Sequence, residues 1–319
     1  MTNTEHLSLR VPDTLAGMRL DQALVEMFSG YSRARLQQWI RSGQVTVDAR
    51  QWRAKDKVLG GEQVELVATL TEEVASLPQP IPLDIVYEDE HLLVVNKPAG
   101  LVVHPAAGNH DGTMLNALLH HAPELVHVPR AGIVHRIDKE TSGLLVVARN
   151  LIAQADLVQQ LQERSIEREY EAVALGVMTS GGSVDAPIGR HPVDRKRMAV
   201  TRHGKPAVSH YRVAERFRIH THIKVHLETG RTHQIRVHMA HIHYPLLGDP
   251  VYGGRLRIPP NSSESLISIL RTFRRQALHA ARLALQHPES GEFMEWRVPL
   301  PEDMSTLIKA LHADQVDHE

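Results

Sequence analysis

An aspartate in a short polar loop is the residue best suited to chemistry in this sequence. Asp138 lies in the stretch HRIDKETSG, residues 135–143, directly before the apolar run LLVVA. A carboxylate beside a buried strand can act as a nucleophile or take a proton from a substrate. Asp, Thr, Ser and Gly also favour a turn, in which Asp138 would only accept hydrogen bonds from the backbone. Composition alone favours the turn.

A cluster of histidines is the second candidate for chemistry. The stretch RTHQIRVHMAHIHYP contains His233, His238, His241 and His243. On a helix, His238 and His241 would lie on one face and could bind a metal ion. No carboxylate is interleaved with the histidines, so we predict that they pack in the core or face a ligand, and that they form no metal site. A His-dependent metallohydrolase is the alternative, and it would be sensitive to chelators.

Missing residue types and motifs exclude several classes of protein. The chain of 319 residues contains no cysteine, which excludes disulfides, cysteine nucleophiles, thiolate zinc sites and iron–sulfur clusters. The GxGxxG, GxxxxGKS/T, HExxH and GxSxG motifs are absent, so we expect no cofactor. The longest purely apolar stretch is residues 144–148, and the N-terminus shows no signal peptide. We therefore expect a cytoplasmic protein that does not enter a membrane.

Charge is unevenly distributed along a nearly neutral chain. There are 36 Lys and Arg against 37 Asp and Glu, a formal net charge of −1. Residues 31–57 nevertheless carry a local charge of +5, residues 189–236 carry +9, and residues 284–319 carry −6. A single basic segment is usually only a solvated surface. Two of them, in different parts of the chain, indicate a polyanionic partner.

A proline-rich stretch divides the chain into two predicted domains, residues 1–75 and 76–319. Residues 68–82 lose their periodicity and contain three prolines, which favour an extended linker. Before this linker, apolar residues at helical spacing predict two helices, and Ser32 is the predicted N-cap of the second. A short strand over residues 44–48 follows it.

Strands and helices alternate irregularly after the linker. The apolar runs and periodicities predict strands over residues 92–96, 101–104, 143–149 and 168–175 and helices over residues 113–121 and 153–164. Because the regular alternation of a doubly wound fold is missing, the predicted class is α+β.

The first unit resembles the S4-type RNA-binding domain. The resemblance rests on LDQAL, residues 20–24, and SRARLQQWIRSGQVTVD, residues 32–48. In that family the second helix presents a basic face to RNA phosphates, and here the face would carry Arg33, Arg35 and Arg41. A small helical domain with an ordinary solvated face is the alternative.

The second unit resembles the RluA-type pseudouridine synthases in four segments that occur in family order. HRIDKETSG is similar to the catalytic signature, and VVNKPAGLVVHP, residues 94–105, to the leading strand and turn. REYEAVALG, residues 168–176, is similar to the tyrosine-bearing strand, and residues 227–254 to the arginine-bearing segment. The resemblance implies a mixed, largely antiparallel sheet flanked by helices. It also implies isomerisation of uridine to pseudouridine, a reaction that needs no cofactor.

The resemblance implies roles for five residues. Asp138 is the catalytic carboxylate, Arg231 is the arginine that pairs with it, and Tyr170 stacks on the target uracil. Arg136 fills the space that the flipped base leaves in the RNA, and Ile235 lines the base pocket. The alternative roles are a phosphate contact for Arg231 and a core position for Tyr170.

The resemblance also implies a substrate. The most similar members of the family act on large-subunit ribosomal RNA, so the expected targets are uridines in the helix 69 stem-loop of 23S ribosomal RNA or its precursor. We expect the enzyme to be a monomer. One alternative is a related synthase acting on other ribosomal or transfer RNA uridines. The other is a non-catalytic RNA-binding assembly factor, which we would expect to lack Asp138 or Tyr170.

Overall fold

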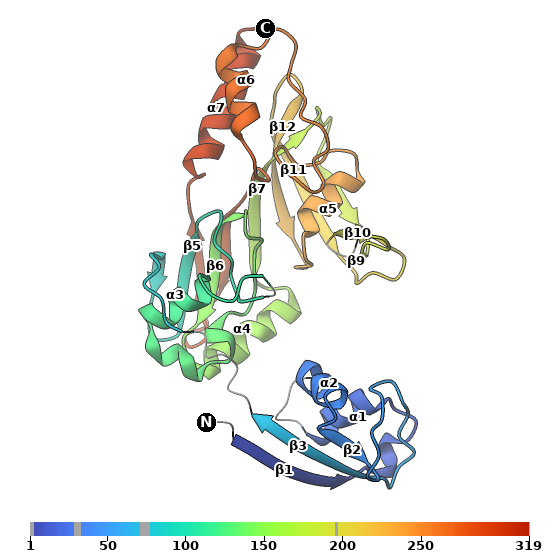
Figure 1. Ribbon diagram of the computed structural model, residues 1–319. Coiled ribbons are helices and arrows are strands. Elements are labelled where there is room, and N and C mark those ends of the chain that lie inside the picture. The colour runs from blue at the N-terminus through green and yellow to red at the C-terminus, as the bar shows by residue number, and fades with distance from the viewer. Residues whose placement is uncertain (1–2, 29–32, 71–76, 107, 195–196, 319) are drawn as a thin grey trace. The chain divides into compact units, whose positions relative to one another are not determined.

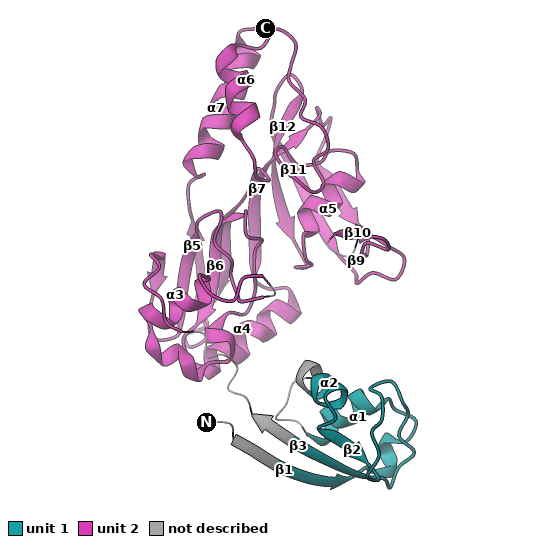
Figure 2. Ribbon diagram, in the orientation of Figure 1, with its two compact units in different colours: residues 1–75 teal, residues 76–319 magenta. Residues whose placement is uncertain are grey.

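The computed structural model describes residues 3–28, 33–70, 77–106, 108–194 and 197–318. The chain divides into two compact units, Met1–Ala75 and Ser76–Glu319 (Figure 2). One cluster of buried apolar residues lies entirely in the first unit, and the other clusters lie entirely in the second. Each unit therefore has a hydrophobic core of its own.

The first unit is a three-stranded antiparallel sheet with two α-helices. The strands are ordered β1-β3-β2. Its elements are β1 (Asn3–Arg10), the 3₁₀ helix η1 (Asp13–Leu15), α1 (Leu20–Met27), α2 (Arg33–Arg41), β2 (Val45–Val47) and β3 (Gln63–Leu70). The predicted apolar helix faces are confirmed, because Leu24, Leu36 and Ile40 are buried in one core. The sequence analysis did not predict β1, whose residues are mostly polar.

The structure does not describe several of the residues predicted for the basic helix. The predicted N-cap Ser32 and the side chains of Arg33 and Arg35 lie outside the described residues. The side chain of Arg41, at the end of α2, is exposed. Its exposure leaves it accessible to a ligand.

Nine strands of the described chain form the sheet of the second unit. Their order is β4-β5-β6-β13-β7-β12-β11-β8, and β14 pairs with β13. Every pairing is antiparallel except that of β6 with β13, where Ser142 and Gly143 run parallel to His279 and Ala280. The predicted mixed, largely antiparallel sheet is confirmed.

The elements of the second unit follow one another along the chain in Figure 1. They are β4 (Asp84–Glu88), β5 (Leu92–Lys97), α3 (Met114–His121), η2 (Pro123–His127), η3 (Pro129–Gly132), β6 (Ser142–Ala148), α4 (Leu151–Glu163), β7 (Glu167–Leu175), β8 (Gly182–Asp185), β9 (Ile188–Arg190), β10 (Met198–Val200), β11 (Val208–Arg216), β12 (His220–Leu227), α5 (Gln234–His241), α6 (Glu264–Thr272), β13 (Leu278–Gln286), β14 (Phe293–Arg297) and α7 (Glu302–Val316). None of the described helices is both long and apolar enough to cross a membrane.

Helices cover both faces of this sheet, which explains the unbroken apolar runs LLVV in β5 and LLVVA in β6. On the first face, Leu93 and Leu145 pack with α3 and α5. On the second face, Leu92 and Leu144 pack with α4. Helices α6 and α7, which lie side by side (Figure 1), cover Val173 of β7. Successive strand residues therefore enter different cores.

The strand predicted over residues 101–104 is wrong. Val102 forms only an isolated bridge with Thr113. The carbonyl oxygens of Val102 and Val103 accept hydrogen bonds from the backbone N–H groups of Met114 and Leu115. Those N–H groups belong to the first turn of α3 and have no partner within the helix. The segment therefore accepts hydrogen bonds from the first turn of α3 and does not extend the sheet.

Candidate active site

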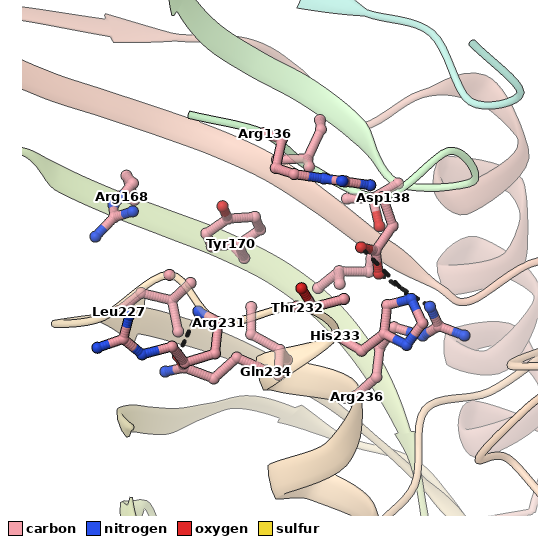
Figure 3. Close-up of a pocket in the computed structure, with 15 residues that line it drawn as sticks. Arg136, Asp138, Arg168, Tyr170, Leu227, Arg231, Thr232, His233, Gln234 and Arg236 are labelled. Atoms are coloured by element: carbon pink, nitrogen blue, oxygen red, sulfur yellow. Dashed lines mark hydrogen bonds and ion pairs between the residues drawn. The ribbon is translucent and has the colours of Figure 1, made fainter. Parts of the chain in front are cut away.

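A pocket lies on the first face of the sheet, beside β7 and the end of β12 (Figure 3). Four segments that are distant in sequence line it, namely the loop before β6, strand β7, the chain that leads from β12 into α5, and the start of β13. The structure brings together here the five side chains to which the sequence assigned roles around the uridine: Arg136, Asp138, Tyr170, Arg231 and Ile235.

The cationic partner of Asp138 is Arg236 and not Arg231. Arg236 Nη1 donates a hydrogen bond of 2.9 Å to Asp138 Oδ2. Arg231 Nε instead donates to the carbonyl oxygen of Pro206. The predicted pairing was wrong because the backbone turns at His233, with φ of 56°, and starts α5 one residue later. That turn brings the first turn of the helix, with Arg236, to Asp138 and leaves Arg231 in the preceding loop.

Arg236 is itself fixed by a second carboxylate. Its Nε and Nη2 donate to the two oxygens of Asp249 over 2.7 and 2.9 Å, and both side chains are buried. Asp249 Oδ1 also accepts from the backbone N–H groups of Val251 and Tyr252. Burial alone would raise the pKa of Asp249, but the hydrogen bonds and charge of Arg236 outweigh it and lower that pKa. The pair therefore presents a rigid guanidinium to Asp138.

The second oxygen of Asp138 is available to a ligand. Within the described residues, Asp138 Oδ1 accepts no hydrogen bond, and His233 Nε2 lies 3.9 Å from it. The side chain of Asp138 keeps 17% of its surface exposed. One oxygen is thus oriented by Arg236 while the other can reach a substrate.

A buried lysine anchors the loop that carries Asp138. Lys97, at the end of β5, is fully buried. Its Nζ donates to the backbone carbonyls of Pro98, Leu101 and Lys139 over 2.8 to 3.0 Å. Burial lowers the pKa of Lys97 to about 7. The bond to Lys139 fixes the residue directly after Asp138 to the end of β5.

The same loop is held from its other side by the segment before β13. Arg275 Nη1 donates to the carbonyl oxygen of Glu140, and Gln276 Nε2 donates to Thr141 Oγ1. The other two nitrogens of Arg275 bind both oxygens of Asp303 at the start of α7. Asp138 therefore sits on a loop with defined backbone partners on both sides, as precise chemistry requires.

Tyr170 forms part of the pocket wall on β7. Its side chain is only 6% exposed, and its hydroxyl group has no hydrogen-bond partner in the described part of the chain. Burial raises the pKa of Tyr170, so the phenol stays protonated at neutral pH. In Figure 3 its ring lies between Asp138 on one side and Arg168 on the other.

The two remaining predicted residues differ in exposure. Arg136 is exposed and has no ion pair among the described residues, whereas Ile235 is 3% exposed and belongs to the core of the first face. Both line the pocket. Arg136 is thus free to contact a ligand, and Ile235 gives the pocket an apolar wall.

Comparison with known proteins identifies the family. The model for RNA pseudouridylate synthase matches residues 91–241, and the model for the S4 domain matches residues 18–64. Ribosomal large subunit pseudouridine synthase D of Escherichia coli (strain K12) is 58% identical over 320 residues, covering 100% of this chain and 98% of that protein. The chain belongs to the RNA pseudouridine synthase family. The enzyme of the same name from Pseudomonas aeruginosa is 58% identical over 315 residues, covering 99% and 98%.

Solved structures of other pseudouridine synthases have the same fold. Human RNA pseudouridylate synthase domain containing 4 is 27% identical, with a TM-score of 0.56, and covers 72% of this chain and 92% of its own. Human RNA pseudouridylate synthase domain containing 1 is 25% identical, with a TM-score of 0.53, and covers 74% and 96%. The S4 domain and the enzyme family implied by the sequence resemblance are confirmed.

Two histidines of the predicted cluster, His233 and His238, have protein partners in this pseudouridine synthase. His238 contacts Ser209 Oγ and the carbonyl oxygen of Ala186, both at 2.9 Å. His233 Nδ1 lies 2.9 Å from the hydroxyl oxygen of Tyr252. Burial lowers the pKa of both histidines, which favours neutral rings at pH 7. Among the described residues, no group of three or more His, Asp or Glu side chains could hold a metal ion.

Arg236, Asp249 and Lys97 of this pseudouridine synthase were not identified as site residues from the sequence. Arg236 stands in the same segment as Arg231, and only the turn at His233 decides which of them reaches Asp138. Asp249 could have been suspected, because an acid in the otherwise apolar run PLLGDP needs a cationic partner when it is buried. Lys97 gave a similar signal at the end of the apolar strand LLVVN.

Proposed function

We propose that this pseudouridine synthase isomerises uridines of 23S ribosomal RNA, with targets in the helix 69 stem-loop. The bacterial relatives are named as ribosomal large subunit enzymes. The observation that carries the proposal is the carboxylate of Asp138, held on one oxygen by Arg236 and open on the other, beside Tyr170 in one pocket. Because a single chain supplies every wall of that pocket, we propose that the enzyme acts as a monomer. We also propose that it acts in the cytoplasm.

The proposed reaction gives Asp138 Oδ1 the central role. The bond between uracil N1 and ribose C1′ breaks, a bond from uracil C5 to C1′ forms, C5 loses its proton and N1 gains one. Atoms and electrons balance without a cofactor. As uracil detaches, Asp138 attacks ribose C1′ or the uracil ring, or takes the proton from C2′. The bond to Asp138 breaks again, or the C2′ proton returns, as the product forms, so the carboxylate is regenerated. Arg236 keeps the carboxylate oriented for any of these steps.

The remaining pocket residues are proposed to hold the RNA. The target nucleotide must leave the base stack to reach the pocket, which costs a few kcal/mol. Tyr170 then stacks on the uracil and Ile235 forms an apolar wall, while Arg136 fills the space left in the RNA. In the S4 domain, we propose that Arg33, Arg35 and Arg41 bind phosphates.

The direct test is to map pseudouridines in ribosomal RNA of a strain that lacks this protein. We expect the pseudouridines of the helix 69 stem-loop to disappear and to return with a plasmid copy of the gene. Loss of pseudouridines at other positions would make the protein a related synthase with another target. An unchanged map would leave only a non-catalytic role in RNA binding.

The role of Tyr170 is tested by its replacement with Leu. Loss of the aromatic ring should lower turnover of an RNA stem-loop by about a hundredfold and weaken RNA binding by less than about tenfold. Single-turnover assays and equilibrium binding separate the two effects. Tyr170→Phe is the matched control, because it keeps the ring and should retain most of the turnover. Unchanged product formation by Tyr170→Leu would contradict stacking on the uracil.

The role of the S4 domain is tested by deletion of residues 1–75. The remaining unit keeps all of its own apolar clusters, so we expect it to fold and to isomerise uridine. Its RNA affinity should fall, and the salt dependence of binding should become shallower by about 0.7 log units per lost phosphate contact. Equilibrium binding at several salt concentrations measures both. Equal affinity, salt slope and choice of target in the two proteins would rule out an RNA-binding role for this domain.

A further inference from the structure

A buried arginine side chain in the pocket wall, that of Arg168, has no hydrogen-bond or ion-pair partner among the residues that the structure describes. Arg168 precedes Tyr170 by two residues on β7, so the two side chains are on the same face of the sheet. Arg168 is 8% exposed, and its Nε is buried without a hydrogen-bond partner. No ion pair to Arg168 forms within the described residues. Burying an unpaired guanidinium is costly, so such a residue indicates a ligand that supplies the missing acceptors.

The neighbouring carboxylates of β7 are already paired with other residues. Glu167 binds Arg282, Glu169 lies near Lys224 and Arg212, and Glu171 contacts His222. These odd-numbered positions alternate with Arg168 along the strand and so lie on the opposite face. None of these three glutamates of β7 is therefore available to neutralise Arg168.

The backbone around Arg168 leaves room for its guanidinium. A Cβ atom added to Gly230 would lie 2.9 Å from Arg168 Nη1. The buried imidazole of His135 is kept neutral, since burial and the charge of Arg168 lower its pKa to about 3. Its Nε2 accepts a hydrogen bond from the backbone N–H of Val146. The surroundings of Arg168 thus provide space for the cation but no counter-charge.

Arg168 also lines a groove that adjoins the pocket and is rich in arginine. We call it the basic groove; Arg130, Arg136, Arg164 and Arg231 line it together with Arg168. Glu228 is the acid in its lining, and both of its oxygens are occupied, by Arg164 at 2.8 Å and by His210 at 2.7 Å. In the described structure the other four arginines have no carboxylate partner. Such a concentration of cations fits a phosphodiester chain.

We propose that Arg168 binds a backbone phosphate of the RNA strand beside the target nucleotide, and that the strand continues along the basic groove. This inference rests on the proposed function. Asp138 stands at one end of the pocket and Arg168 at the other, with Tyr170 between them (Figure 3). A nucleotide whose uracil stacks on Tyr170 and whose ribose meets Asp138 carries its negative charge only on its phosphates. A guanidinium matches such a group with two parallel hydrogen bonds.

The first test compares Arg168→Met with Arg297→Met. Arg297 is 60% exposed and paired with Glu295 on β14, so its replacement removes one guanidinium outside the pocket and groove. For a stem-loop substrate, Arg168→Met should weaken binding by about 10- to 100-fold and reduce the salt slope by about 0.7. The melting temperature should stay unchanged or rise, because an unpaired buried charge is removed. A lower melting temperature with unchanged affinity and salt slope would make Arg168 a structural residue and overturn the proposal.

The second test neutralises the phosphates instead of the arginine, so its main measurement is made on the wild-type protein. Single methylphosphonates are placed at each phosphate flanking the target uridine, and binding is measured for each RNA. One neutral phosphate should weaken wild-type binding by about tenfold, and at that position Arg168→Lys should lose less affinity than the wild type does. If no flanking phosphate matters, the proposal fails. Wild-type protein that forms no pseudouridine in the unmodified RNA would instead refute the proposed function.

Discussion

Replacing Asp138 by Asn is expected to lower pseudouridine formation by at least about a thousandfold. The amide has nearly the same shape as the carboxylate, but it is neither a nucleophile nor a base at neutral pH. RNA binding should stay within a few-fold of wild type, because the phosphate contacts are untouched. Single-turnover release of tritium from 5-tritiated uridine in a stem-loop, together with equilibrium binding, measures both quantities.

Asp84→Asn is the matched control for this variant. Asp84 lies at the start of β4, outside the pocket, and accepts a hydrogen bond from Asn96 on the next strand. The control should keep full turnover. If Asp138→Asn retained turnover within tenfold of wild type, Asp138 would not be the catalytic group.

Replacing Arg236 by Met should cost about 3–5 kcal/mol of unfolding free energy and abolish turnover. The substitution leaves the carboxylate of Asp249 buried without its cation, and it removes the group that orients Asp138. Denaturant unfolding at pH 7 measures the loss of stability. Arg236→Lys keeps the charge but not the paired hydrogen bonds, so an intermediate loss is expected. A stability change below about 1 kcal/mol would show that the ion pair does not hold the site together.

The pH dependence of this loss follows from the pKa of Asp249. In the wild type, Arg236 holds that pKa below its ordinary value of 3.8. The resulting stabilisation is present above this value and is lost as pH falls through the lowered pKa. In Arg236→Met the guanidinium is gone, so burial, which raises the pKa of Asp249, is opposed only by the hydrogen bonds from the backbone N–H groups of Val251 and Tyr252. The variant should therefore gain stability as pH falls from 7 towards 4, and the difference from the wild type should narrow over that range.

Strand positions and the residues that line the site were largely readable from the sequence, because both depend on local patterns. Runs such as LLVVN and GLLVVA predict strands buried on both faces, and HRIDKETSG predicts the loop with Asp138. The partner of Asp138 was not readable, since Arg231 and Arg236 lie in one motif and a single left-handed residue, His233, decides between them. The lack of an ion-pair partner for Arg168 among the described residues is likewise visible only in the folded structure, where distant segments come together.

The position of β13 in the sheet has a consequence for how the enzyme is made. This strand, residues 278–286, lies between β6 and β7, which precede it by more than a hundred residues. Until it is synthesised, β6 and β7 expose unpaired edges, a state prone to aggregation. Arg275 and Gln276, which anchor the loop of Asp138, are synthesised just before β13. At ordinary rates of translation, roughly 7 to 30 seconds separate the appearance of Asp138 from the end of β13. A nascent chain therefore carries Asp138 well before its pocket is complete, and only a nearly finished chain can modify RNA.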